Sequence, residues 1–218
     1  MNRAIRFALT LGLLPLLLGA CCGSCGTCED SEAVMMPTSD PVVILHTTMG
    51  DLTLALDATR APVTTGNFLR YARRGAYDGN IVHRVVPGFV IQSGGRTADL
   101  SELPSDDPIV NEWNNGLTNR KYSVGMARES EPDSATRQFF INLADNARLD
   151  IARDVSGGAG YAVFAQVVGG MDIVDRIGEV ETAPYDADDL ELAAVPVTPI
   201  TITHVTILND PHGGDTDG

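Results

Sequence analysis

The chain has 218 residues, of which 15 are basic and 29 acidic, so its formal net charge at neutral pH is -14. That length fits one globular domain with a sizeable hydrophobic core. A surface this acidic repels the phosphates of nucleic acids and anionic lipid headgroups, so neither is expected as a partner.

The first 20 residues have the features of a bacterial export signal. Arg3 and Arg6 form a short positive segment, and residues 7–18 are almost wholly apolar. This run is shorter than the roughly 20 residues that a membrane-spanning helix needs. It ends in LGAC at residues 18–21, which resembles the lipobox of bacterial lipoproteins. We therefore expect a signal peptide at 1–20, lipid attached to Cys21, and an extracytoplasmic location in the cell envelope, either facing the periplasm or at the cell surface.

All four cysteines lie between residues 21 and 28, and Cys22, Cys25 and Cys28 have the spacing used by iron-sulfur proteins. A cluster needs four thiolates, and only three remain if Cys21 carries the lipid, so the pattern favours an anchor over a metal or redox site. A secreted protein without lipid is the second alternative. In an oxidising compartment the three thiols could form one disulfide and leave one cysteine over.

Residues 21–40 are polar and predict a flexible tether, residues 41–209 a single domain, and residues 210–218 a disordered acidic tail. Within residues 61–77, Pro62 is placed near the start of a helix and Gly75 is placed to end it. A second, amphipathic helix is predicted over 169–180. Strands are predicted at 42–48, 51–56, 81–86, 88–92, 122–127, 138–143, 161–168 and 200–208. The fold class is therefore mainly β, a closed eight-stranded antiparallel barrel capped by two α-helices.

The stretch IVHRVVPGFVIQSGG at residues 81–95 carries the clearest chemical pattern. Strand alternation places Arg84 on the face opposite His83 and Val85. Gln92 follows the turn at Pro87 and lies among apolar residues. An arginine and a glutamine on an apolar face suit a pocket that holds an amide and an apolar ring. The spacing also leaves open a simple ion pair between Arg84 and a carboxylate.

Four blocks of the chain resemble cyclophilins in the same order. VHRVVPGFVIQSGG (82–95) is similar to the family signature, and SATRQFFINLADNARLD (134–150) to a second block in the form of bacterial periplasmic members. VGMAR (124–128) and YAVFAQVVGGMDIVDRI (161–177) are the other two. The resemblance implies a peptidyl-prolyl cis-trans isomerase that needs no metal or cofactor. Because a small barrel is filled by side chains, the active site is expected on its outer face.

The resemblance also assigns roles to residues. It implies Arg84, Gln92 and Phe140 as catalytic residues, and as substrate-binding residues Phe89, Val90, Ala127, Leu149 and Tyr161, with His83, Arg128 and Gln138 flanking the groove. Two positions depart from the eukaryotic pattern, which has a tryptophan in place of Arg148 and a histidine in place of Tyr161. The only tryptophan, Trp113, lies in a segment that does not match.

The expected activity is rotation of X-Pro bonds in unfolded or loop segments of envelope and secreted proteins, with proline-containing polypeptides as partners. The alternative is a catalytically weak proline-peptide binding module or chaperone on the same fold. The chain is expected to be a monomer that touches the membrane only through its lipid. The acidic stretch 186–191 lacks the ligand register of a calcium-binding loop, so it is interpreted as a solvated loop.

Overall fold

The computed structural model describes residues 40–187 and 190–210, all within one compact unit, Pro37–Gly218. The predicted signal peptide, Cys21 with its expected lipid, the other cysteines and the tail from residue 211 onward lie outside the described residues. No helix in the described ranges has both the length and the apolar character needed to cross a membrane.

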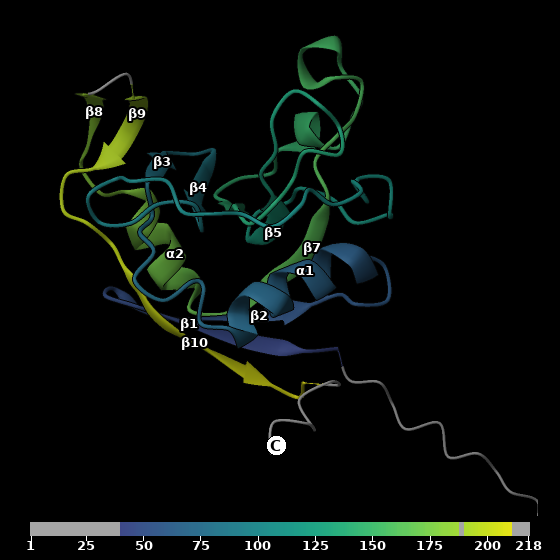
Figure 1. The fold of residues 1–218 in the computed structure, drawn as a ribbon, viewed down its shortest axis with the longest axis horizontal. Helices are drawn as coiled ribbons and strands as arrows, with labels where there is room; N and C mark the ends of the chain where they lie inside the picture. Colours follow the sequence, from purple (N-terminus) through teal and green to yellow (C-terminus); the bar gives the residue numbers. More distant parts are fainter. Residues whose placement is uncertain (1–39, 188–189, 211–218) are drawn as a thin grey trace, which may run out of the picture. The chain divides into compact units, whose positions relative to one another are not determined.

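Eight strands form one antiparallel sheet in the order β10-β1-β2-β7-β5-β6-β4-β3 (Figure 1). They are β1 (Val42–Thr47), β2 (Gly50–Leu56), β3 (Arg84–Val86), β4 (Val90–Ser93), β5 (Ser123–Met126), β6 (Phe139–Asn142), β7 (Val163–Gly169) and β10 (Ile202–Leu208). Each corresponds to one strand predicted from the sequence. The mainly β fold with eight antiparallel strands and two helices is confirmed.

The sheet is strongly curled, but its two edge strands, β10 and β3, share no ladder within the described ranges. They are linked by an isolated bridge between Ile81 and Thr201. Beside this bridge Val82 N donates to Ile200 O at 2.8 Å, and Ile202 N donates to Asn80 O at 2.8 Å. These bonds explain why β3 is shorter than the predicted strand 81–86, since residues 80–82 pair with the opposite edge. In the described ranges the main sheet is therefore curled and joined across its two edges by one bridge. The continuous ladder of the predicted closed barrel is not seen there.

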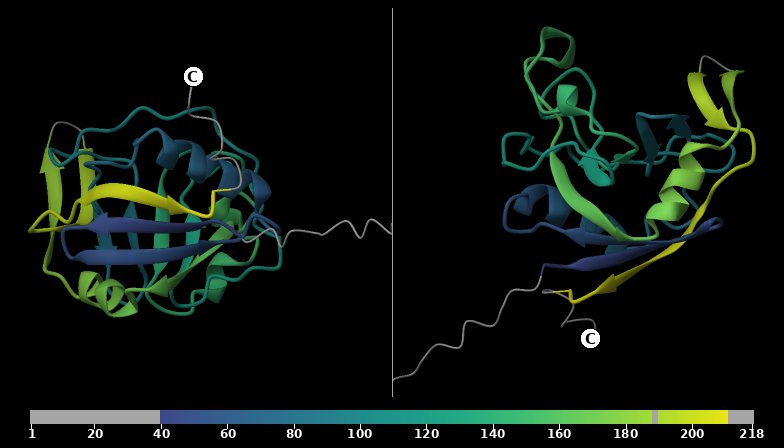
Figure 2. Two further views of the ribbon diagram at one scale, coloured as in Figure 1. Left: turned by 90° about the horizontal axis from the view of Figure 1, so that it is seen from below. Right: turned by 180° about the vertical axis from the view of Figure 1, so that it is seen from behind.

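The two helices, α1 (Pro62–Arg73) and α2 (Met171–Gly178), lie at opposite ends of the curled sheet (Figure 2). The first free N–H groups of α1 donate to the distant Glu112 carboxylate, from Val63 N at 3.1 Å and Thr64 N at 2.8 Å. A carboxylate at this end also complements the helix dipole. Helix α1 ends at Arg73, and the turn that follows contains Gly75, whose φ of 66° is left-handed, so the helix ends close to the glycine predicted to end it.

A hairpin formed by β8 (Thr182–Ala187) and β9 (Leu190–Pro196) was not predicted from the sequence. It forms a separate two-stranded sheet with β9 beside β3 of the main sheet (Figure 1), and its described strands include Asp186 and Glu191 of the acidic stretch that was interpreted as a loop. Pro184 and the aspartates of this stretch are poor strand formers. Apolar and polar residues also do not alternate consistently along it, so the usual pattern of a strand is missing. Two short 3-10 helices, η1 (Ala147–Leu149) and η2 (Asp154–Ser156), were also not predicted.

The interior of the curled sheet is filled by side chains. Phe68 packs on Tyr77, Phe139 and Phe164, with ring centroids 5.0 to 5.5 Å apart. Apolar residues of all eight main strands complete the cluster, including Leu54 of β2 and Ile202 of β10. Because this volume is occupied, a polypeptide ligand can be bound only on the outer surface.

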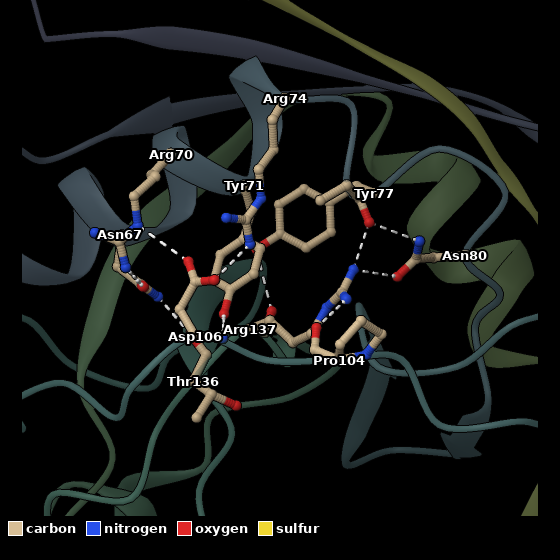
Figure 3. Close-up of polar contacts among 11 residues, drawn as sticks. Asn67, Arg70, Tyr71, Arg74, Tyr77, Asn80, Pro104, Asp106, Thr136 and Arg137 are labelled. Atoms are coloured by element: carbon tan, nitrogen blue, oxygen red, sulfur yellow. Dashed lines mark hydrogen bonds and ion pairs between the residues drawn. The ribbon is translucent and has the colours of Figure 1, made fainter.

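A buried guanidinium ties the loop before β6 to this core (Figure 3). Arg137 is 3% exposed, and it donates to the backbone carbonyls of Ala76 and, at 2.8 Å, Pro104. Its guanidinium also lies 5.2 Å from the centre of the Tyr71 ring. Tyr77 Oη in turn donates to Arg137 O at 3.1 Å. Carbonyls and aromatic faces compensate this buried charge, which fixes the start of β6 against α1.

Candidate active site

The site begins with a row of residues across four neighbouring strands. Arg84 of β3 pairs with Gln92 of β4, Gln92 pairs with Phe140 of β6, and Phe140 pairs with Gly125 of β5. Their sequence neighbours Val85, Ile91 and Phe139 belong to the core cluster. Since side chains alternate along a strand, the row lies on the outer face of the sheet.

A groove of about 270 Å³ lies over this row. Its lining residues are Arg84, Phe89, Val90, Gln92, Ala127, Arg128, Phe140, Leu149 and Tyr161. These are nine of the eleven site residues expected from the resemblance; His83 and Gln138 do not line it. The apolar members form a small cluster separate from the core. A hollow of about 470 Å³ beside Met49 is larger, but its lining has neither an arginine nor an aromatic ring.

Arg84 is half-buried and has no carboxylate partner among the described residues, so the simple ion pair is not seen there. Its Nη1 donates to Gln92 Oε1 at 3.4 Å, and Gln92 Nε2 donates to Gln138 Oε1 at 2.9 Å. Burial lowers the pKa of the Arg84 guanidinium from its usual value. Gln138 therefore orients Gln92 from behind the groove, and most Arg84 N–H groups have no hydrogen-bond partner among the described residues.

Two glycines make room for these side chains. A Cβ on Gly125 would lie 2.5 Å from Cζ of the Phe140 ring, and a Cβ on Gly95 would lie 2.5 Å from Cδ of Gln138. Real Cβ atoms do not approach so closely, so a Cβ on Gly125 would force the Phe140 ring to move, and one on Gly95 would displace the flexible end of Gln138. Phe140 also contacts the edge of Tyr161, with ring centroids 6.0 Å apart and planes at 80°. The resemblance did not assign either glycine.

Arg128 lines the groove, but its hydrogen-bonding capacity is used within the protein. Its guanidinium lies 4.6 Å from the centre of the Tyr161 ring. At 2.7 to 3.4 Å it donates to the backbone carbonyls of Glu129, Ser130, Ser156, Ala159 and Gly160. Tyr161 N donates to Leu149 O at 2.8 Å and closes the base of the loop between them. Arg128 therefore holds this loop, and with it one wall of the groove.

A buried asparagine network supports the opposite wall and was missed from the sequence. Asn146 Nδ2 donates to Asn142 Oδ1 at 2.7 Å and to Phe89 O at 2.9 Å. Asn142 Nδ2 donates to Asn119 Oδ1 at 3.1 Å. Asn119 donates to Asp150 Oδ1 through N and Nδ2. The one available signal was an asparagine that ends the apolar strand FFIN, because a buried polar side chain needs partners.

His83 lies behind the groove and is 3% exposed, with no hydrogen-bond partner for its Nδ1. Burial lowers its pKa to about 4, and the positive charges of Arg96 and Arg84 act in the same direction. The imidazole is therefore neutral near pH 7 and packs as part of the support for β3. No three histidine, cysteine, aspartate or glutamate side chains in the described part of the chain are placed to share a metal ion.

This fold and groove define a class of protein, and comparison with known families agrees. Residues 42–207 match the family model described as cyclophilin type peptidyl-prolyl cis-trans isomerase/CLD. The chain therefore belongs to the cyclophilin family of peptidyl-prolyl cis-trans isomerases.

Several bacterial peptidyl-prolyl cis-trans isomerases are similar to the chain over most of its length. It is 45% identical to peptidyl-prolyl cis-trans isomerase A of Dickeya dadantii, over 78% of this chain and 86% of that one. It is 46% identical to the isomerase cyp18 of Streptomyces antibioticus, over 76% of this chain and 98% of that one. It is also 46% identical to peptidyl-prolyl cis-trans isomerase B of Escherichia coli, over 65% of this chain and 86% of that one.

Solved structures agree on the fold. A cyclophilin from Cryptosporidium parvum, crystallised in the presence of the dipeptide Ala-Pro, gives a TM-score of 0.61 at 22% identity, over 77% of this chain and 98% of that one. The cyclophilin AquaCyp293 from Hirschia baltica gives a TM-score of 0.60 at 18% identity, over 82% of this chain and 77% of that one.

The low pKa of His83 predicts a pH-dependent stability. The unfolded chain binds a proton at this residue near pH 6.5, whereas the folded chain binds it near pH 4. The contribution of the neutral, buried His83 to the free energy of unfolding is therefore fully present above pH 6.5. It is lost as pH falls toward 4, which lowers the stability by about 3 kcal/mol. Urea unfolding at pH 7, 5.5 and 4 should show that His83→Gln removes this part of the pH dependence. The exposed His204→Gln should retain it, and identical pH profiles for His83→Gln and wild type would contradict the assignment.

The contact between Gly125 and Phe140 predicts that Gly125→Ala displaces the ring from the groove floor. We expect kcat/KM for a proline peptide to fall about tenfold or more, because small misplacements of a binding group are costly. Gly66→Ala is the control, since Gly66 lies on the exposed face of α1 with no atom within 4 Å of its added Cβ. It should keep full activity and gain up to about 1 kcal/mol of stability. Unchanged activity of folded Gly125→Ala would refute the tight fit.

Proposed function

We propose that the chain accelerates X-Pro bond rotation by donating a hydrogen bond from Arg84 to the prolyl nitrogen. Resonance in the planar amide imposes a rotation barrier of about 18–20 kcal/mol. In the twisted transition state resonance is lost and the nitrogen regains a lone pair, which accepts a hydrogen bond that neither planar isomer can accept. A donor at this point therefore binds the transition state in preference to the substrate.

The other groove residues supply binding and orientation. Phe140 and its apolar neighbours hold the proline ring, while Gln92 keeps the Arg84 guanidinium in place and contacts the adjacent peptide. A thousandfold acceleration needs about 4 kcal/mol, which one aligned donor in a partly dry site can supply. The observation that carries this proposal is the half-buried Arg84 with one weak side-chain acceptor at the edge of an apolar groove.

We further propose that the enzyme acts as a lipid-anchored monomer in the cell envelope, on unfolded or loop segments of exported proteins. The lipobox-like residues 18–21 and the apolar segment before them support the anchor. The groove is lined by residues of one chain, so a second copy is not needed to form it.

Arg84→Ala should lower kcat/KM by about a hundredfold with little change in stability, because the donor acts mainly in the transition state. Arg84→Lys keeps the charge but loses the planar donor pair, so it should recover only part of the activity. The measurement is exchange NMR on a proline peptide with the purified full chain. The exposed Arg60→Ala is the control. Near-wild-type rates for Arg84→Ala would refute the donor role, and equally negligible rates for it and wild type would support the binding-module alternative.

The anchor predicts that Cys21→Ser releases the protein from membranes. Cell fractionation should find wild type in the membrane fraction and Cys21→Ser in the soluble envelope fraction. Cys22→Ser, one residue away, should remain in the membrane fraction with an acylated N-terminus by mass spectrometry. Equal membrane retention of both variants would refute attachment at Cys21.

A further inference from the structure

The charges around the groove are opposite in sign to those of the chain as a whole. The chain carries 29 acidic and 15 basic residues. Yet the groove lining contains two arginines, Arg84 and Arg128, and no carboxylate. A third arginine, Arg148, lies beside it, with its guanidinium 4.4 Å from the centre of the Phe89 ring. An acidic protein thus carries a local positive rim at its substrate groove.

Arg148 is held in this position by the backbone on either side of it. It is the middle residue of η1, a single 3-10 turn. Before the turn, Asn146 donates to Phe89 O at 2.9 Å. After it, the Asp150 carboxylate accepts from Asn119 N at 2.8 Å. The turn that bears Arg148 and the loop that bears Phe89 are therefore fixed to each other.

Of the three arginines, Arg148 has the most donor capacity left for a ligand. The N–H groups of Arg128 donate to backbone carbonyls. Arg84 is proposed to donate to the prolyl nitrogen. Arg148 is exposed and has no hydrogen-bond or ion-pair partner among the described residues. The nearest acid in sequence, Asp150, is already bonded to Asn119. A guanidinium stacked on an aromatic face can still donate through its edge to a carboxylate.

We infer that Arg148 is a specificity-determining residue that selects polypeptide segments with an aspartate or glutamate near the proline. This inference rests on the proposed function of the groove. The client carboxylate lies over the rim formed by Phe89 and Arg148 while the proline occupies the groove. The net negative charge of the protein opposes acidic clients at long range, but within a Debye length of about 8 Å at physiological salt the nearest charge dominates.

The test uses capped hexapeptides with one proline and with Glu, Gln or Lys at one flanking position at a time, on either side. For the full chain at physiological salt, we expect kcat/KM to be about three- to tenfold higher for Glu than for Lys at one or more positions. Peptide affinity, measured by NMR titration, should show the same order. At 0.5 M salt the ratio should shrink, because exposed charges are screened.

Three variants separate charge from shape at this position. Arg148→Gln should bring the Glu to Lys ratio close to one, and Arg148→Glu should invert it. Arg148→Lys should keep part of the preference, since the charge remains without the planar stacking. The exposed Arg120→Gln, which lies outside the groove lining, is the control and should leave the ratio unchanged. The Gln peptide should be turned over within twofold of wild type by all variants.

Failure of this inference is distinguishable from failure of the proposed function. A Glu to Lys ratio that is the same in wild type and Arg148→Gln would overturn the inference while leaving isomerase activity on the Gln peptide intact. If the Gln peptide is not isomerised at all, the proposed function fails. In that case the NMR affinities still decide whether Arg148 selects acidic segments.

Discussion

The register of four strands is the constraint on which the site depends. Arg84, Gln92, Phe140 and Gly125 occupy one cross-strand row, and each is flanked along its strand by residues that face the core. Because side chains alternate with a period of two, a slip of one residue would turn the arginine into the core and a core residue into the groove. The packing of Val85, Ile91 and Phe139 in the core therefore also fixes which side chains face the candidate active site.

The walls of the groove are built differently, from loops whose polar groups are satisfied internally. Arg128 collects five backbone carbonyls on one side, and the Asn119–Asn142–Asn146 network fixes the Phe89 carbonyl on the other. Loops without such bonds would have to be ordered when substrate binds, and that entropy would oppose binding. The sheet thus positions the chemical groups, and buried hydrogen bonds hold the walls that surround them.

These two modes of construction explain what could be predicted from the sequence. Alternation in IVHRVV separated Arg84 from His83, and all eight main strands were located, because both are local patterns. The roles of Gly125 and Gln138 depend on which residue lies across the ladder, which a local pattern does not contain. The asparagine network joins residues 31 positions apart, and the β8–β9 hairpin contains aspartates and Pro184 without a sustained apolar alternation. Cross-strand pairing and satisfied polar groups were therefore the part that required the structure.

The chemistry and the selectivity of such an enzyme come from different parts of the groove. A proline ring and its amide are common to every client, so the row that contains Arg84 and Phe140 offers little means of choosing between them. Selection has to come from the rim, where side chains meet the residues on either side of the proline. Here the rim position occupied by tryptophan in eukaryotic cyclophilins is Arg148, which lies against Phe89 on a fixed turn. An apolar ring at that position would favour apolar neighbours, whereas a guanidinium with unused donors favours a carboxylate. A single change outside the catalytic row can thus alter which clients are bound while the rotation step stays the same.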